Sequence, residues 1–288
     1  MKTITILSGK GGVGKSSITA SLAIALSKYK KIICADCDVD ASNLSIVIGT
    51  TKKESWNDLS TNEKIKFDYN KCTLCKKCYD VCNFDAICWD DKPILKEFSC
   101  EGCGFCELIC PEKAITLEKI YNAKIGYVNS GYGFKVVSAQ LNAGASGSGK
   151  VVFEVRKKAR ELAEDSEITL IDSSAGIGCP VIASVSGTDY AIVVTEPTPS
   201  GFSDMKKAIE VLDHFKVPYG IIINKFNINT KYTDKIGSFA DEHDIEILAR
   251  LPYDKKFTEA LVNLTPIIDY DTKFRPIFDN ISKILIDK

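Results

Sequence analysis

The sequence has little histidine, no long apolar run and no excess of charge of either sign. A formal net charge of −1 gives the chain no general attraction to nucleic acids or anionic membranes. No apolar run approaches the roughly 20 residues that a helix needs to span a bilayer. The two histidines, His214 and His243, fall in predicted helices and are not expected to bind a metal. We therefore expect no nucleic-acid or membrane partner, and we expect thiolates to hold any metal.

A secretion signal is also missing, because the chain enters a predicted apolar strand within its first residues. The sequence therefore predicts a cytoplasmic protein. Twelve cysteines in such a protein indicate metal or redox chemistry rather than disulfides. The 288 residues, 45% of them hydrophobic and 26% charged, suffice for one large globular domain or two smaller ones.

Residues 8–17 match the phosphate-loop pattern G-x-x-x-x-G-K-[ST], which ends in Lys15 and Ser16. A predicted strand over 3–7 leads into the loop and a predicted helix over 17–29 leaves it, so the helix N-terminus faces the bound anion. The glycines let backbone N–H groups turn toward a phosphate, Lys15 neutralises its charge, and the Ser16 hydroxyl is placed to bind Mg²⁺. The predicted nucleotide-binding residues of this loop are Gly9, Lys10, Gly11, Gly12, Val13, Gly14, Lys15, Ser16 and Ser17.

Lys10 is a second lysine that an ordinary phosphate loop does not need. The run from Gly9 to Ser17 resembles the deviant Walker A motif of the MinD/ParA/Mrp superfamily of P-loop ATPases, to which the nitrogenase iron protein is distantly similar. The resemblance implies an ATPase that dimerises around ATP, as a homodimer or with a paralogue, and in which Lys10 reaches the partner's nucleotide. A solvated lysine beside the phosphates is the alternative.

An acidic segment follows the second predicted strand, over 31–35, at the strand end where open α/β sheets bind ligands. The segment resembles the switch I region of the same ATPases. By that resemblance Asp36 and Asp38 belong to the nucleotide site, and Asp38 helps to place Mg²⁺ and the attacking water. The predicted catalytic residues are Lys10, Lys15 and Asp38.

Eight cysteines form two runs with the spacing C-x₂-C-x₂-C-x₃-C, which is the spacing of bacterial ferredoxins. The runs are Cys72, Cys75, Cys78 and Cys82, then Cys100, Cys103, Cys106 and Cys110. An Ala-Ile pair follows the last cysteine of each run by four residues, so one unit recurs after 28 residues. Two [4Fe–4S] clusters fit this repeat. Two structural zinc sites are the alternative, but zinc does not require the third and fourth cysteine of each run.

In ferredoxins of this type the fourth cysteine of each run binds the other cluster. The resemblance therefore implies that Cys110 completes the first cluster and Cys82 the second. The remaining cysteines include Cys88 and a C-x-x-C formed by Cys34 and Cys37. We expect no metal there, because Cys34 should face the core and Cys88 has no cysteine counterpart in the second repeat.

The ATPase pattern resumes with a predicted strand over 167–172 that ends in Asp172, as a Walker B strand does. The next segment resembles switch II of the family, in which a glycine, here Gly176, senses the γ-phosphate. Cys179 lies about where the nitrogenase iron protein has one of its cluster cysteines. That protein needs a second such cysteine, which is missing outside the two runs, so we expect Cys179 to be a buried or merely nearby thiol.

Two later strand ends complete the predicted nucleotide site. The strand predicted over 218–223 is followed by Asn224 and Lys225, and Asn224 resembles the family's adenine-contacting residue. The strand predicted over 245–251 is followed by Pro252-Tyr253-Asp254, where the family again approaches the base. The resemblance therefore adds four nucleotide-binding residues, Asn224, Lys225, Pro252 and Asp254.

Strands that alternate with helices predict an α/β fold with a doubly wound, mostly parallel sheet. The alternation stops at about Thr51, where the resemblance implies an inserted α+β ferredoxin domain. The predicted parts are residues 1–60 and 121–288 for the ATPase domain and 61–120 for the insert.

Four further elements are predicted after the insert. Residues 124–128 and 134–139 predict a β-hairpin, followed by a surface loop over 142–150 and a helix over 151–164. The last 15 residues have the period of an amphipathic helix without a basic excess, so we expect the helix to dock onto the body of the protein rather than onto a membrane.

The combination favours an ATP-gated electron-transfer protein that passes electrons through its clusters to a partner oxidoreductase. The alternative is an iron–sulfur cluster carrier or assembly ATPase with an apo-metalloprotein as its partner. A spatial-positioning ATPase like MinD or ParA is a third possibility, disfavoured by the neutral charge and the C-terminal helix.

Overall fold

The computed structural model describes residues 1–50 and 54–288, so the point near Thr51 where the alternation was predicted to stop lies outside the described residues. The chain forms two compact units. The first comprises Met1–Trp56, Ile125–Gln140 and Ser148–Lys288, and the second comprises Asn57–Lys124 and Leu141–Gly147. The predicted insert, residues 61–120, lies within the second unit.

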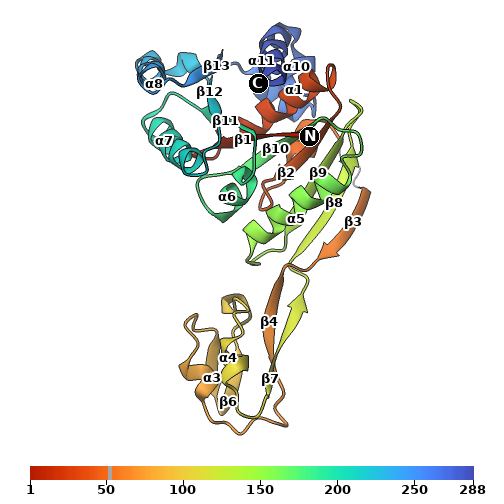
Figure 1. The fold of residues 1–288 in the computed structure, drawn as a ribbon, viewed down its shortest axis with the longest axis vertical. Helices are drawn as coiled ribbons and strands as arrows, with labels where there is room; N and C mark the ends of the chain where they lie inside the picture. Colours follow the sequence, from red (N-terminus) through yellow and green to blue (C-terminus); the bar gives the residue numbers. More distant parts are fainter. Residues whose placement is uncertain (51–53) are drawn as a thin grey trace. The chain divides into compact units, whose positions relative to one another are not determined.

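A mostly parallel sheet forms the centre of the first unit (Figure 1). Among the described residues it has nine strands, in the order β13 (Glu246–Leu251), β12 (Tyr219–Asn224), β11 (Tyr190–Thr195), β1 (Lys2–Ser8), β10 (Ile168–Ala175), β2 (Ile32–Cys37), β9 (Lys135–Leu141), β8 (Ala123–Asn129) and β3 (Glu54–Leu59). All neighbours from β13 to β9 pair in parallel. The predicted α/β fold with a mostly parallel sheet is confirmed.

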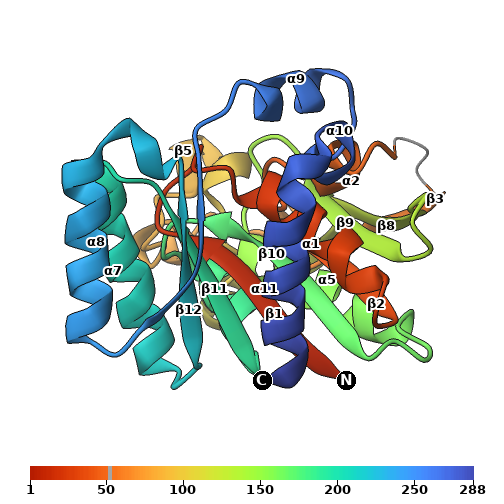
Figure 2. The ribbon, with the colours of Figure 1, turned by 90° about the horizontal axis from the view of Figure 1, so that it is seen from above.

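The parallel strands are short apolar runs, buried on both faces because helices cover both sides of the sheet. In β11, Ile192 and Val194 face one layer, and Ala191 and Val193 face the other. The first layer contains α1 (Lys15–Ser27) and α11 (Arg275–Asp287), and the second contains α6 (Cys179–Val185), α7 (Pro199–His214) and α8 (Thr230–Glu242) (Figure 2). The remaining helices of this unit are α2 (Leu44–Val47), α5 (Ser148–Glu161), α9 (Lys256–Val262) and α10 (Ile267–Tyr270).

The C-terminal helix α11 docks onto the sheet, as predicted. Phe278, Ile281 and Leu285 on α11 are fully buried in the same cluster as α1 and β1, and Phe274 just before the helix is buried with them. This face is therefore covered within the chain. In the part of the chain that the structure describes, no helix has the length and apolar character to cross a membrane.

The predicted hairpin corresponds to β8 and β9, which are neighbours in the sheet. The Ser130 N–H closes the turn by donating to the Phe134 carbonyl at 2.9 Å. After β9 the predicted loop is shorter than expected, because α5 begins at Ser148 rather than at Val151. Residues Leu141–Gly147 pack within the second unit, and Ser148 then starts a helix of the first unit that packs against α6 and β2.

The second unit is built from two antiparallel pairs and two short helices among its described residues. Strand β4 (Asn62–Phe67) pairs with β7 (Ile115–Ile120), and β5 (Ile87–Asp90) pairs with β6 (Lys92–Leu95). The helices are α3 (Lys77–Asp80) and α4 (Phe105–Ile109). The polar stretch from Trp56 to Tyr69, in which the sequence shows no clear period, forms the end of β3 and all of β4.

The 28-residue sequence repeat is also a repeat of backbone conformation. Leu74 and Gly102 have φ values of 59° and 66°, and Lys76 and Gly104 have values of 64° and 76°. Lys76 and Gly104 each precede the first residue of a short helix, α3 and α4. A left-handed conformation costs a non-glycine residue about 1 kcal/mol or more. The first repeat therefore carries backbone strain that glycine relieves in the second.

Candidate functional site

The phosphate loop connects β1 to α1 at the carboxyl edge of the parallel sheet. Gly12 and Gly14 take left-handed conformations, with φ values of 80° and 90°, which place successive N–H groups around one centre. A Cβ atom at Gly14 would lie 2.5 Å from Asn224 Nδ2, and one at Gly9 would overlap the backbone of Asp204. A side chain at Gly9 would therefore displace the backbone at Asp204, and one at Gly14 would displace the Asn224 side chain.

Lys15, the lysine of the loop, is buried against β10. Its Nζ atom lies 2.9 Å from Asp172 Oδ1, to which the Thr19 hydroxyl also donates at 2.9 Å. Burial works to lower the pKa of Lys15, but Asp172, Asp36 and Asp38 together raise it above its usual value. The ammonium group is therefore charged and can bind an anionic ligand.

Asp36, near the end of β2, lies opposite Asp172, and β10 continues to Ala175 rather than ending at Asp172 as predicted. Both are fully buried, and Asp172 Oδ2 has no hydrogen-bond partner among the described residues. Burial and the Asp172 charge raise the pKa of Asp36 to about 7, although the Leu44 N–H and the Ser42 hydroxyl donate to it. An orphaned buried carboxylate oxygen beside a second carboxylate is the donor set that a hard cation such as Mg²⁺ prefers.

Asp38 follows two residues after Asp36 and is partly exposed. Its N–H donates to Asp36 Oδ1 at 3.2 Å. Burial raises the pKa of the Asp38 carboxyl, while Lys15 opposes that effect. The structure thus brings Lys15, Asp36, Asp38 and Asp172 together at one edge of the sheet.

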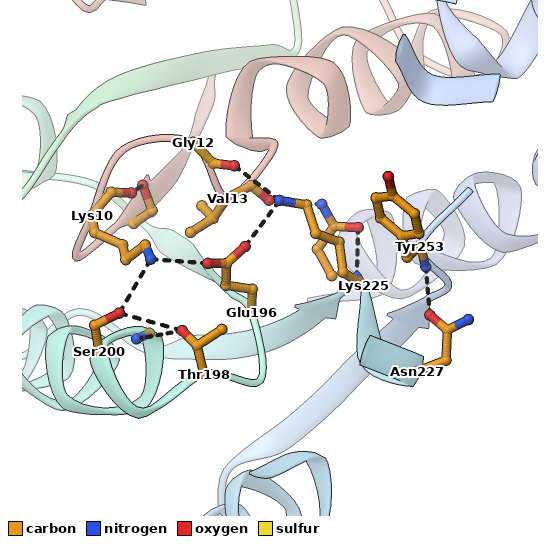
Figure 3. Close-up of polar contacts among 12 residues, drawn as sticks. Lys10, Gly12, Val13, Glu196, Thr198, Ser200, Lys225, Asn227 and Tyr253 are labelled. Carbon is orange, nitrogen blue, oxygen red and sulfur yellow. Dashed lines mark hydrogen bonds and ion pairs between the residues drawn. The ribbon is translucent and has the colours of Figure 1, made fainter. Parts of the chain in front are cut away.

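The second lysine of the loop, Lys10, folds back onto its own chain (Figure 3). Its Nζ atom lies 2.9 Å from Glu196 Oε1 and 3.2 Å from the Ser200 hydroxyl. Lys225 approaches the same carboxylate, with its Nζ 2.9 Å from Glu196 Oε2 and 3.1 Å from the Gly12 carbonyl. Glu196 therefore holds both lysines at the mouth of the loop, a role that the sequence analysis missed.

A cavity of about 230 Å³ opens beside the loop. All four residues predicted at the later strand ends line it together with loop residues, and the lining set is Gly12, Gly14, Ser17, Asn224, Lys225, Pro252, Tyr253, Asp254, Phe257, Thr258 and Leu261. Asn224 connects the wall of this cavity to the phosphate loop, because its Nδ2 donates to the Val13 carbonyl at 2.7 Å. Tyr253 and Phe257 add aromatic surface that suits a flat base. Tyr253 lies in the run predicted to approach the base, whereas Phe257 was not predicted from the sequence.

A larger cavity, of about 560 Å³, lies at the opposite edge of the sheet, where β2, β9 and β10 begin. Its lysines are paired with carboxylates: Lys30 with Glu167, and Lys135 with Glu164. No residue predicted to bind nucleotide lines it. We therefore place the nucleotide site in the smaller cavity, beside the loop.

The segment after β10 contains the predicted switch II residues. Gly176 has a φ of 98°, and its N–H donates to the Ser8 carbonyl at 2.9 Å, which ties this segment to the phosphate loop. Cys179 begins α6 and is exposed, so the prediction of a buried thiol is wrong and that of a merely nearby one remains. Gly149 in α5 packs directly against Cys179, since a Cβ at Gly149 would lie 3.3 Å from the Cys179 Cβ. Cys34 is buried in the core, as predicted.

Eight of the nine cysteines of the second unit line two separate cavities. The first is lined by Cys72, Cys75, Cys78 and Cys110, and the second by Cys82, Cys100, Cys103 and Cys106. Each cavity thus combines three cysteines of one run with the fourth cysteine of the other. Cys88 lines neither; its thiol donates to the Ile94 carbonyl across the β5–β6 pair.

The two cavities present matching sulfur environments. The Ala86 N–H donates to Cys82 Sγ at 3.3 Å, and the Ala114 N–H donates to Cys110 Sγ at the same distance. In the described part of the chain, no three His, Cys, Asp or Glu side chains converge closely enough to hold a single metal ion. Each cavity is lined by four cysteines, which is the number of thiolate ligands that one [4Fe–4S] cluster takes.

Comparisons with known proteins agree with the geometry of the loop. The family model for the CobQ/CobB/MinD/ParA nucleotide binding domain matches residues 4–267. An uncharacterized protein of Methanocaldococcus jannaschii is 37% identical over 274 residues, which cover 94% of this chain and 91% of that protein. The iron-sulfur cluster carrier protein of Pyrococcus abyssi is 24% identical, with 99% of this chain and 85% of that protein covered.

Among solved structures, the septum site-determining protein MinD complexed with Mg-ADP from Pyrococcus horikoshii has a similar fold. The TM-score is 0.61 and the identity 21%, with 99% of this chain and 95% of that chain covered. The family model spans most of the sequence, and the phosphate loop, the buried lysine and the acidic strand ends meet at one edge of the sheet. The chain belongs to the CobQ/CobB/MinD/ParA family of nucleotide-binding ATPases.

Proposed function

We propose that the chain is an iron–sulfur ATPase: it binds and hydrolyses ATP as a MinD-like dimer and couples this to electron transfer through two [4Fe–4S] clusters to a partner oxidoreductase. The pair of four-cysteine cavities carries the proposal, because each supplies a complete set of thiol ligands within a chain that also has an ATPase site.

At the nucleotide site, the loop N–H groups and Lys15 bind the phosphates, and Gly176 responds to the γ-phosphate. Mg²⁺ supplies charge compensation for phosphoryl transfer, and Ser16 with the carboxylates of Asp36 and Asp172 would hold it. Asp38, partly exposed at the end of β2, orients the attacking water. Asn224, Lys225, Pro252 and Asp254 line the base end of the cavity.

In the second unit, each cluster would accept and donate one electron. Cys72, Cys75, Cys78 and Cys110 would hold the first, and Cys82, Cys100, Cys103 and Cys106 the second. The N–H groups of Ala86 and Ala114 already donate to one sulfur of each set, and such hydrogen bonds tune the potential of an iron–sulfur centre.

Dimerisation is the step that would change the partner of Lys10. Lys10 now pairs with Glu196 of its own chain at 2.9 Å. We propose that ATP binding and dimerisation release Lys10 to reach the nucleotide of the partner, either a second copy of this chain or a paralogue. In this proposal the Lys10–Glu196 pair within one chain breaks when the dimer forms.

Helices α6 and α5 connect the switch II segment to the segment Leu141–Gly147. Cys179 begins α6 directly after the switch II segment, and α6 packs against α5. The segment Leu141–Gly147 precedes α5, and its residues 142–146 line a cavity together with Cys100. A shift of switch II that moves α6 and α5 would therefore be passed to a segment that lines a cavity together with a proposed cluster ligand.

An anaerobic redox titration monitored by EPR, with and without MgATP, tests this coupling. We expect MgATP to shift a midpoint potential or to change the magnetic coupling between the clusters. Lys10→Ala is the matched control: Lys10 is partly exposed, so the variant should fold and bind ATP but not dimerise, and MgATP should then have no effect. Superimposed titrations of the wild-type protein would refute the coupling.

A cluster carrier or assembly ATPase is the second candidate. Cys75 and Cys103 are exposed, one in each cavity, which leaves each cluster a route to an acceptor. A relative named as an iron-sulfur cluster carrier protein aligns with nearly the whole chain. This function requires clusters that pass intact to an apo-metalloprotein. Clusters that resist a chelator and never transfer would rule it out.

A further inference from the structure

The two cysteine cavities differ in the charges that surround them. Lys76, Lys77 and Glu112 line the first cavity. Among the described residues that line the second, Glu101 is the charged one. One cavity therefore has an excess of positive charge and the other an excess of negative charge.

The 28-residue repeat shows which residues cause the difference. Lys76 corresponds to Gly104, so a lysine of the first repeat is a glycine in the second, with the same left-handed backbone. Glu101 corresponds to Thr73, so the charge of the second cavity is absent from the first repeat. The hydrogen bonds to Cys82 and Cys110 have equal lengths, 3.3 Å, in the two halves. Charge therefore distinguishes two sites whose backbone and sulfur hydrogen bonds match.

We propose that the two sites have different reduction potentials: Lys76 and Lys77 raise the potential of the first, and Glu101 lowers that of the second. The inference rests on the proposed function, since it requires a cluster in each cavity. Reduction by one electron from a low-potential reductant adds one negative charge to a cluster and its four thiolates. Nearby cations favour that added charge and a nearby carboxylate opposes it.

Lys76 is well placed to act on the first site. Its Nζ atom lies 5.1 Å from the ring centroid of Trp89, and Trp89 lines the same cavity. The cation–π contact holds the ammonium group beside the cavity wall rather than out in solvent. Lys76, Lys77 and Glu101 are all exposed, so added salt should weaken their effect.

A difference in potential gives the electron path a direction. An electron that enters at the second site would pass to the first, because the site of higher potential is the more readily reduced. Cys100, a predicted ligand of the second cluster, shares a cavity with residues 142–146, the segment that leads into α5. The site of lower potential is therefore the one next to the segment connected to the ATPase site, and the site of higher potential holds the electron for the partner.

The test is an anaerobic EPR-monitored titration of the full-length protein and of two variants that exchange residues between the repeats. Lys76→Gly installs the residue of the second repeat at a left-handed position, and Glu101→Thr installs that of the first. We expect two reduction waves in the wild-type protein. At one applied potential, the ratio of reduced to oxidised cluster should differ at least tenfold between the two sites, which corresponds to midpoint potentials that differ by about 59 mV for one electron. Lys119→Thr, at an exposed position that lines neither cavity, is the control.

Lys76→Gly should lower only the higher potential, Glu101→Thr should raise only the lower one, and Lys119→Thr should change neither. A single wave in the wild-type protein, or variants that move the opposite wave, would overturn this inference and leave the proposed function intact. Protein purified without oxygen that contains no iron or sulfide would overturn both.

Discussion

Replacing Glu196 with glutamine is expected to strengthen the ATP-dependent dimer. Burial works to raise the pKa of Glu196, but hydrogen bonds from Lys10 and Lys225 hold it below its usual value, so the carboxylate is charged at neutral pH. The proposed role of Lys10 in the partner's site requires each protomer to break its own Lys10–Glu196 pair. Glutamine keeps the shape of the side chain and removes the charge that holds the lysine.

The size of the effect follows from the exposure of the pair. The side chain of Glu196 is 11% exposed and that of Lys10 is 31% exposed, so solvent screens the pair in part. We assign the ion pair an interaction free energy of about 1 kcal/mol per protomer. A dimer breaks two such pairs, which amounts to about 2 kcal/mol, or roughly a 30-fold change in the dissociation constant of the dimer.

Sedimentation velocity with Mg²⁺ and a non-hydrolysable ATP analogue measures that constant. Glu196→Gln should dimerise at lower concentration than the wild-type protein. In a Lys10→Ala background the same substitution should change nothing, because the lysine is gone. ATP affinity measured well below the dimerisation range checks that Lys225 still supports the loop. Unchanged or weaker dimerisation with normal ATP affinity would refute the proposed role of the Lys10–Glu196 pair.

Three further predictions concern single positions. Burial and a neighbouring carboxylate raise the pKa of Asp36 to about 7, so Mg²⁺ affinity at fixed ATP should fall as the pH drops from 8 to 6. Asp36→Asn should flatten this pH profile. A flat profile in the wild-type protein would contradict the argument. Gly9→Ala should lower the free energy of unfolding in urea by about 1–3 kcal/mol, because its Cβ would overlap the backbone of α7, whereas Gly11→Ala, with open space around it, should have little effect. Cys75→Ala should lose about half of the bound iron and Cys88→Ala none; equal losses would argue against the ligand assignment.

Residues that follow local rules were predictable from the sequence. The apolar run predicted as a strand over 218–223 is β12, Tyr219–Asn224, because buried parallel strands need only a short apolar segment between turns. The phosphate loop was predictable for the same reason, since its glycines and Lys15 are consecutive in the chain. The predicted residues at later strand ends are also brought together, because parallel strands end at one edge of the sheet.

Features that depend on distant partners were not predictable. Glu196 follows β11 directly, but its role comes from Lys10, which lies 186 residues away. The pairing of β4 with β7 joins segments separated by most of the second unit, and neither segment alternates clearly in sequence. Helix α6 has seven residues, too few for a helical period to emerge. The exposure of Cys179 depends on where that short helix begins.

The strand order also bears on biosynthesis. Strand β1 lies between β10 and β11, so it can pair with both neighbours only after residue 195 has been made. The eight cysteines, which end at Cys110, and the segment Leu141–Gly147 emerge well before that point. We expect the cysteine unit to acquire its fold, and the proposed iron, on a nascent chain whose ATPase sheet is still open. Metal loading would then precede the first nucleotide that the chain can bind.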